Sequence, residues 1–392
     1  MALPARLPQN QEAPMRQITT VMVLMVSGLL ALAAVQSAEA DTYTFTKIVD
    51  NTVLDPLAFT AMNNSGTVAT GAFNPATGHI DILTGSGGPL TTIAEVSSIA
   101  GSPAINNAGT VAFTTQTIAG ERYIVTGSGG GLTTVIDSSG TLFGFGQPRI
   151  NDGGLVAFQA SGTPPGGGAT GPFYTIINGT VTTIGQSGAR SGSDFSMNNA
   201  GTTIASNGSE IFSSTGTATI TIADLTGMFS GFSAPPWIND NGTVALLASL
   251  DKGGEGVFTI GAGGITMIAD NSGGISTFAA GPSINNLGEV AFIAHLRTGG
   301  DGIFTGPDLL ADKVIQTGDS LFGSEVTSLS FQRPSLNDLG QVAFFATRFN
   351  GSSGIFRADP VSSVPAPSTW LLFGSGLAGL TGLAYWQRKQ TA

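Results

Sequence analysis

Seven asparagines recur along this 392-residue chain, each followed three residues later by a glycine. The pairs are Asn63/Gly66, Asn106/Gly109, Asn151/Gly154, Asn198/Gly201, Asn239/Gly242, Asn285/Gly288 and Asn337/Gly340. Equivalent amides at seven places could bind a ligand. However, an asparagine that closes a turn with its side chain, ahead of a glycine that supplies a positive φ, already has a complete local role. We therefore expect these residues to be structural.

Three of these motifs place a carboxylate directly after the asparagine, at Asp152, Asp240 and Asp338. Carboxylates on one rim could chelate calcium. Calcium loops, however, draw several oxygens from one short series such as Asp-x-Asn-x-Asp-Gly, and this chain contains no such series. We expect no cofactor, with calcium at these three residues as the alternative.

Catalytic chemistry has few other sources in this chain. The absence of cysteine excludes disulfides, zinc-thiolate sites and thiol nucleophiles, and the two histidines, His79 and His295, lie near no nucleophile motif. The acid pairs of a glycosidase have candidates in Asp308/Asp312 and Asp319/Glu325, but spacing alone does not bring two carboxylates to the required separation. No catalytic or metal-binding residue is predicted.

Sugar-binding surfaces usually display Trp or Tyr. Before residue 361 the chain has one tryptophan, Trp237, which follows Pro235-Pro236 just ahead of a recurring asparagine. Both a core position at a junction between repeats and an exposed position fit that context. The many phenylalanines recur at matched positions of the repeat and are expected in the core.

The composition indicates an exported β-rich protein. Charged residues are 10% of the chain, while 57 of the 392 residues are glycine. Residues 41–361 carry 10 Lys or Arg against 23 Asp or Glu, a net charge of −13. A surface of that sign repels phosphate backbones, so nucleic acid is excluded as a partner.

The intervals between the seven asparagines are 43, 45, 47, 41, 46 and 52 residues. Each interval holds an apolar run such as VAFTT, a second such as GIFT, a third such as LTTVID, and a variable segment leading to the next asparagine. Four strands in about 45 residues is the size of one β-propeller blade. We predict an all-β, seven-bladed β-propeller over residues 41–360, with a solenoid or a pair of smaller β domains as alternatives.

The ends of the array predict how the ring closes. The last repeat supplies only two strands, LGQVAFFATRF and SGIFRAD, while TYTFTKIVD at 42 corresponds to a third strand. The seventh blade is therefore predicted to combine N- and C-terminal strands.

The two termini read as export and sorting segments. Residues 15–40 combine Arg16, an apolar run and the small residues Ala38 and Ala40 of an A-x-A cleavage site, so residues 1–40 are predicted to be a signal peptide, with Met15 as an alternative start. A retained N-terminal membrane anchor is the alternative interpretation. Export machinery and signal peptidase are the partners implied.

After a linker at 361–368, residues 369–386 form an uncharged apolar run near the length that spans a bilayer as a helix. Arg388 and Lys389, in the tail 387–392, predict a cytoplasmic C-terminus.

The order Pro365-Ala366-Pro367-Ser-Thr-Trp, an apolar helix and a basic tail resembles the PEP-CTERM sorting signal of exopolysaccharide-producing Gram-negative bacteria. The resemblance implies an inner-membrane anchor, cleavage by an exosortase, and release to the cell surface or extracellular matrix. Pro365 and Pro367 match the signature, whereas Ala366 stands where glutamate is usual.

The internal units resemble bacterial extracellular repeats of the form Asn-x-x-Gly-x-x-Ala-Phe, a family that implies no activity. We expect a non-enzymatic structural or adhesive protein, with exopolysaccharide as its candidate ligand in a biofilm matrix. The alternative is a polysaccharide hydrolase or lyase on the same scaffold. An enzyme would show acidic or basic residues from several blades converging on one rim.

Overall fold

The computed structural model describes residues 43–162, 173–184, 195–216 and 218–361, which all lie in one compact unit beginning at Asp41. This part of the chain is built of β-strands and turns, and none of it forms a helix long and apolar enough to cross a membrane. The predicted signal peptide and the predicted membrane span at 369–386 lie outside these residues.

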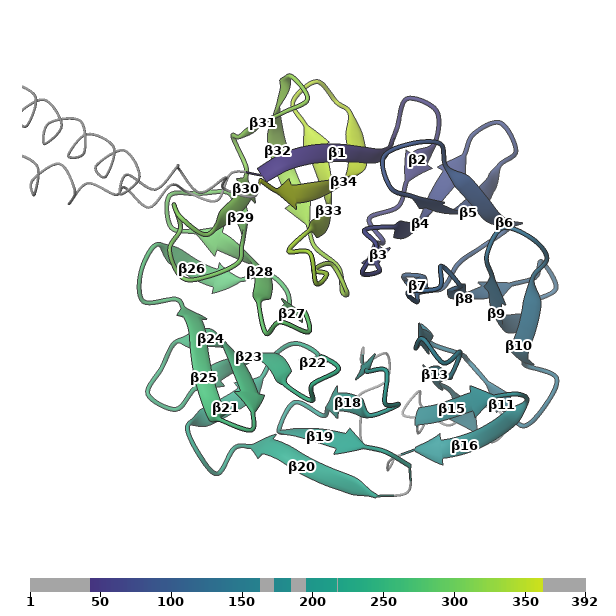
Figure 1. Ribbon diagram of the computed structural model, residues 1–392, viewed down its shortest axis with the longest axis horizontal. Helices are drawn as coiled ribbons and strands as arrows, with labels where there is room; N and C mark the ends of the chain where they lie inside the picture. The colour runs from purple at the N-terminus through teal and green to yellow at the C-terminus, as the bar shows by residue number, and fades with distance from the viewer. Residues whose placement is uncertain (1–42, 163–172, 185–194, 217, 362–392) are drawn as a thin grey trace, which may run out of the picture. The chain divides into compact units, whose positions relative to one another are not determined.

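Seven sheets of four or five strands surround a central axis, so the protein is a seven-bladed β-propeller, as predicted (Figure 1). We number the blades I to VII by their recurring asparagines. Blade I contains β2 (Asp55–Pro56), β3 (Ala61–Met62), β4 (Val68–Asn74), β5 (His79–Gly85) and β6 (Thr91–Val96). Blade II contains β7 (Ala104–Ile105), β8 (Val111–Gln116), β9 (Arg122–Gly127) and β10 (Thr133–Asp137). Blade III contains β12 (Arg149–Ile150), β13 (Val156–Gln159), β15 (Phe173–Ile177) and β16 (Thr180–Ile184), with a small ladder of β11 (Leu142–Phe143) and β14 (Ser161–Gly162).

Blade IV contains β17 (Ser196–Met197), β18 (Thr203–Ser206), β19 (Glu210–Ser214) and β20 (Thr219–Asp224), and blade V contains β21 (Phe229–Phe232), β22 (Trp237–Ile238), β23 (Val244–Leu250), β24 (Glu255–Gly261) and β25 (Gly264–Asp270). Blade VI contains β26 (Ile275–Phe278), β27 (Ser283–Ile284), β28 (Val290–Leu296), β29 (Asp301–Phe304) and β30 (Lys313–Gln316). Blade VII contains β31 (Ser320–Leu321), β32 (Ser324–Ser330), β33 (Val342–Arg348), β34 (Ser353–Pro360) and β1 (Tyr43–Asp50).

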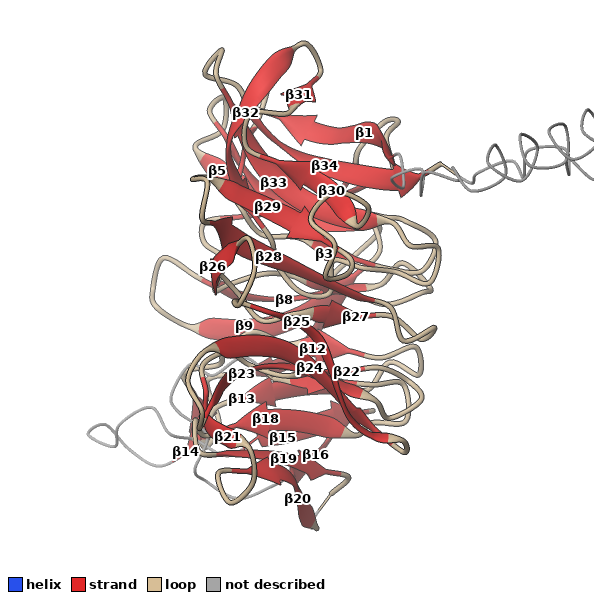
Figure 2. Cartoon of the chain, turned by 90° about the vertical axis from the view of Figure 1, so that its left-hand side faces the viewer, coloured by secondary structure: helices blue, strands red, loops and turns tan. Residues whose placement is uncertain are grey.

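Each blade is an antiparallel meander whose strands follow one another outward from the axis (Figures 1 and 2). The inner strand has two residues in blades II, III and IV, is broken into two short pieces that pair with the same neighbour in blades I, V and VI, and has seven residues only in blade VII, where it is β32. The variable segment before each asparagine forms this inner strand of the next blade. Its variability therefore reflects irregular pairing at the centre of the ring.

The ring closes in blade VII through the N-terminal strand. β1 pairs antiparallel with β34, from Tyr43 opposite Pro360 to Asp50 opposite Gly354, and becomes the outermost strand of the blade. The two ends of the described chain therefore leave the propeller side by side. Pro360 lies against Gly340, so both ends lie on the face that carries the Asn-Gly turns.

The core lies between the blades. Seven clusters of buried apolar side chains are found in the described residues, and each joins two adjacent blades, including blades VII and I. The recurring phenylalanines Phe113, Phe158, Phe292 and Phe344 are fully buried on the second strands. Burial of each such side chain stabilises the fold by about 1.5–3 kcal/mol. Because the clusters lie between blades, each blade depends on its neighbours rather than on a core of its own.

Candidate functional site

The seven asparagines lie at one mouth of the central axis, where the inner strand of each blade turns into the second. In blade V, the backbone N–H of Asn239 donates to the carbonyl of Thr243 (3.0 Å), and its Oδ1 accepts from the N–H of Thr243 (2.9 Å). The N–H of Gly242 returns to the carbonyl of Asn239 (3.1 Å), with φ +81° at the glycine. The other six turns repeat these contacts.

The glycine of each turn lies in the left-handed region of the backbone. In the other six blades these residues are Gly66 (φ +77°), Gly109 (+81°), Gly154 (+79°), Gly201 (+80°), Gly288 (+86°) and Gly340 (+71°). Each donates its N–H to the carbonyl of the asparagine three residues earlier, at 3.0–3.1 Å. The structure therefore places these seven predicted positions in the backbone of the turns, where a side chain other than hydrogen would be strained.

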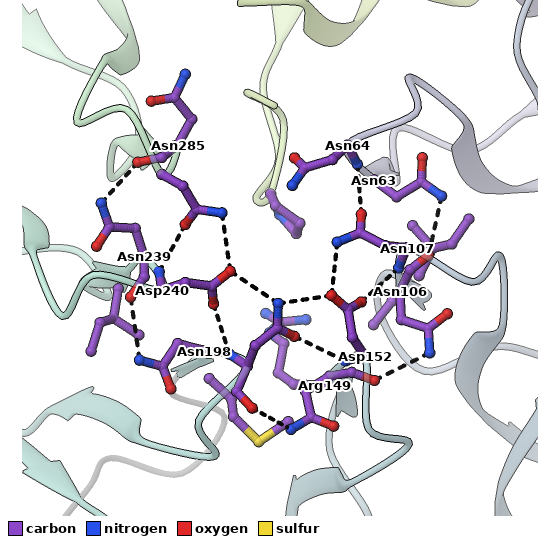
Figure 3. Close-up of a pocket in the computed structure, with 18 of the residues that line it drawn as sticks. Asn63, Asn64, Asn106, Asn107, Arg149, Asp152, Asn198, Asn239, Asp240 and Asn285 are labelled. Atoms are coloured by element: carbon purple, nitrogen blue, oxygen red, sulfur yellow. Dashed lines mark hydrogen bonds between the residues drawn. The ribbon is translucent and has the colours of Figure 1, made fainter. Parts of the chain in front are cut away.

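The side-chain amide nitrogen of each asparagine donates to a backbone carbonyl of the next blade (Figure 3), and in blades VI and VII it also donates to Glu289 and Gln341 of its own turn. Nδ2 of Asn239, for example, donates to the carbonyl of Asn285 at 2.8 Å. The full series of donor and acceptor residues is 63 to 106, 106 to 151, 151 to 199, 198 to 239, 239 to 285, 285 to 337 and 337 to 63. These bonds form a closed circuit through all seven blades, and the seven asparagines are between 2% and 7% exposed.

The residue after each asparagine forms a second circuit. Its backbone N–H donates to the side-chain Oδ1 of the equivalent residue in the next blade, at 2.7–3.2 Å. In blade order these residues are Asn64, Asn107, Asp152, Asn199, Asp240, Asn286 and Asp338. We call the two circuits together the asparagine ring.

The three aspartates predicted as a calcium alternative alternate with asparagines in this ring. Oδ2 of Asp152 accepts from the amides of Asn107 and Asn199, both at 2.8 Å, and Asp240 and Asp338 are held in the same way. Each carboxylate therefore has charge-assisted partners on both sides. Among the described residues no group of three or more Asp, Glu or His side chains is arranged to hold a metal ion.

The axis beneath the ring is narrow and largely filled. A cavity of about 130 Å³ remains there, lined by the ring and by apolar residues such as Ile105, Ile238 and Ile284 that precede the asparagines. Arg149 of blade III donates from Nε to the carbonyl of Phe195 in blade IV (2.9 Å), and its guanidinium stacks on Trp237 of blade V at 5.1 Å. These contacts connect three successive blades beneath the ring.

The turn glycines take no part in this cavity. Its lining includes all of the recurring asparagines except the one in blade VII, but none of the seven glycines, Gly66, Gly109, Gly154, Gly201, Gly242, Gly288 and Gly340. The two residues of each pair are hydrogen-bonded to each other, but in blades I to VI only the asparagine lines the cavity. The asparagine faces the axis and the next blade, while the glycine only sets the course of the backbone.

Trp237 is 6% exposed, so the structure places it in the core rather than on a sugar-binding surface. Arg149 was missed by sequence reasoning. The sequence could have indicated it, because Arg149 is the one charged residue at the position two before the recurring asparagine. The other blades carry Ala61, Ala104, Ser196, Trp237, Ser283 and Ser335 there.

The two histidines lie apart on the blades. His79 lies 3.2 Å from Glu95, and Nδ1 of His295 lies 2.5 Å from Asp301. Both histidines are partly exposed, and each pairs with a carboxylate of its own blade.

The acid pairs considered for glycoside hydrolysis lie outside the cavity beneath the ring. Asp308 and Asp312 both accept backbone hydrogen bonds in one loop between β29 and β30. Asp319 instead pairs with Lys313 at 3.1 Å. Asp308, Asp319 and Glu325 do not line a second cavity in the described residues either, whereas Asp312 lines it together with Glu289 and Asp338.

A second set of aspartates ends the outermost strands of blades II, IV and V, on the face opposite the ring. Asp137, Asp224 and Asp270 each accept hydrogen bonds from the side-chain hydroxyl and the backbone N–H of a residue two positions on, namely Ser139, Thr226 and Ser272. The hydroxyl bond first, and the backbone bond second, lowers the pKa of each carboxyl below its ordinary value of 3.8.

Acid is expected to destabilise the protein through these three groups. A carboxyl whose pKa is lower in the folded state contributes stability above its unfolded pKa, and that contribution is lost as the pH falls through 3.8 toward the folded value. Replacing Asp137, Asp224 and Asp270 by Asn keeps the acceptor oxygen and removes the titration. The variant should melt below the native protein at pH 7, because the charge-assisted hydrogen bonds are lost, and its melting temperature should fall less steeply below pH 4, so that the two proteins converge in acid. An unchanged slope would contradict this assignment.

The fold and the ring define an all-β, seven-bladed propeller whose chain continues into a sorting segment. Residues 125–371, more than half of the chain, match the family of unknown function DUF7453, and the chain belongs to that family. Residues 363–389 match the PEP-CTERM protein-sorting motif. This motif confirms the predicted sorting signal and implies an exported, cell-envelope-sorted protein that an exosortase processes.

Several solved structures match the chain at low identity. YCF48 bound to a D1 peptide is 9% identical, with a TM-score of 0.47 over 82% of this chain and 97% of that one. The propeller domain of the Trilobed protease from Pyrococcus furiosus is 12% identical, with a TM-score of 0.37 over 65% of this chain and 93% of that one. TolB from Acinetobacter baumannii is 15% identical, with a TM-score of 0.35 over 64% and 52%. These likenesses have no bearing on function. No curated protein matches the chain.

Proposed function

We propose that this protein is a non-catalytic propeller with a structural or adhesive role in the exopolysaccharide matrix at the cell surface. In this proposal, residues 369–386 hold the exported chain in the inner membrane, and exosortase cleavage at the motif of Pro365 and Pro367 releases it. The internal units then belong with the extracellular Asn-x-x-Gly-x-x-Ala-Phe repeats.

The observation that carries the proposal is the asparagine ring. Propeller enzymes need acidic or basic side chains free to act on a substrate where blades converge. Here the carboxylates that converge on the mouth, Asp152, Asp240 and Asp338, are bonded on both sides by amides of the neighbouring blades. The same contacts stabilise the ring, which supports a structural use of these residues.

A binding experiment tests the adhesive role. Processed protein from exosortase-positive cells is applied to an array of neutral and acidic exopolysaccharides, with and without EDTA, and heat-denatured protein serves as the control. We expect retention of the folded protein only, unaffected by EDTA, with no shortening of the glycans. Release of oligosaccharides would instead favour the hydrolase or lyase alternative, and retention on none of the glycans would reject the adhesive role.

A further inference from the structure

Two leucines depart from the pattern of the asparagine ring. The third residue of the Asn-x-x-Gly turn is small or polar in blades I to V, where it is Ser65, Ala108, Gly153, Ala200 and Asn241. Blades VI and VII carry Leu287 and Leu339 there, and these side chains are 70% and 60% exposed. Since five turns form without a large apolar residue, the leucines are not required by the turn.

The two leucines line one cavity of about 460 Å³ on the ring face. Ile268 and Tyr43 add apolar surface to it, and Pro360, the last residue of β34, lies at its edge. The described chain therefore leaves the propeller at the cavity itself. Exposed apolar side chains and the exit of the chain thus coincide at one place on this face.

We propose that this cavity holds the segment that follows it, residues 362–367, and so covers the sorting motif. The segment reads SSVPAP: it is uncharged, and its last four residues are small and apolar, which suits a cavity with leucines and with Glu289, Asp312 and Asp338 in its lining. Pro365 is the fifth residue after Pro360, so it can reach at most about 18 Å from it. Attachment at the rim also gives the segment a high effective concentration.

A second copy of the chain suits the cavity less well. The chain carries a net charge of −11, and the acidic residues at the rim would face the equally acidic surface of another copy. The tethered segment is uncharged, and because it is attached at the edge of the cavity, it loses little translational entropy when it binds there.

The consequence for sorting depends on the proposed function. A motif held in the cavity is withheld from exosortase until it dissociates, so docking slows processing of the folded propeller. The leucines at 287 and 339 then regulate when the chain is released from the membrane.

Cysteine cross-linking of the full chain tests the docking directly, because the chain has no cysteine of its own. Leu287→Cys with Val364→Cys is compared with Ser65→Cys with Val364→Cys. Blades VI and I both adjoin blade VII, and the carbonyl of Gly66, next to Ser65, accepts from Arg357 of β34, so both turns lie beside the strand from which the chain leaves, but only residue 287 lines the cavity. We expect the first pair to form an intramolecular disulfide at least about tenfold faster. Equal rates would overturn the proposal, and disulfide-linked dimers would identify a second copy as the occupant.

Processing in exosortase-positive cells tests the regulatory consequence. Leu287→Ser with Leu339→Ala installs residues that blades I and II carry at this position, so melting should be unchanged. We expect the variant to lose its C-terminal segment several-fold faster than the native chain. Equal rates would overturn the shielding role. Failure of both chains to be processed would instead reject the proposed sorting, while the cross-linking result would still decide the docking.

Discussion

Deleting residues 43–50 is expected to unfold the whole propeller rather than blade VII alone. β1 covers the outer edge of β34, and its Ile48 and Val49 are 5% and 6% exposed in the cluster that joins blades VII and I. Loss of two such side chains costs about 4–8 kcal/mol, close to the total stability of an ordinary domain. The deletion also opens the ring, so the remaining blades lose their closed arrangement of neighbours.

Thermal unfolding followed by circular dichroism measures this effect in chains that retain the export signal. The matched control is Ile93→Ala, which alters an equally buried residue on the outermost strand of blade I without removing a closing strand. That variant should lose about 2–4 kcal/mol and still unfold in one transition. A deletion variant with native melting would show that closure by β1 contributes little.

The substitution Asn239→Asp is expected to destabilise the propeller by about 3 kcal/mol. Asn239 is 5% exposed, and its Nδ2 donates at 2.8 Å to the carbonyl of Asn285. The substitution places a carboxylate oxygen against that carbonyl, so a bond between blades V and VI becomes a repulsion in a buried site. Oδ1 keeps its contact with the turn, which confines the loss to the contact between blades.

Asn207→Asp is the matched control for this change. Oδ1 of Asn207 accepts from the N–H groups of Ser209 and Glu210, at 2.9 and 2.8 Å, and an aspartate oxygen can accept both. Chemical denaturation should show a change within about 0.5 kcal/mol for this variant. Equal losses in the two variants would mean that the contacts between blades add nothing to the turns.

The blade number and the closure could be predicted because both depend on local repetition. Seven Asn-Gly turns at similar intervals require seven equivalent units, and TYTFTKIVD carries the pattern of the strand that the last unit lacks. The burial of the recurring phenylalanines follows from the same periodicity. Each of these inferences uses contacts within one unit or between units adjacent in the chain.

The ring could not be predicted in this way, because its bonds join residues 41 to 52 positions apart and close through Asn337 and Asn63, 274 positions apart. A turn motif accounts for the side-chain oxygen Oδ1 of each asparagine. The backbone carbonyl that accepts from its side-chain nitrogen Nδ2 belongs to the next blade, so that bond is defined only once the blades are arranged in a circle. The alternation of Asn and Asp at the next position has the same origin. Because seven is odd, two residues of the same type must be neighbours somewhere, and here they are Asn64 and Asn107.

The position of β34 has a mechanical consequence for a chain held by its C-terminus. A pull on the C-terminal side of Pro360 enters the propeller through β34, which lies between β33 and β1 and is not an edge strand. Force along β34 therefore loads two antiparallel ladders in shear, so that many hydrogen bonds resist together rather than opening one after another. The N-terminal strand thus reinforces the strand that would bear the load of anchoring.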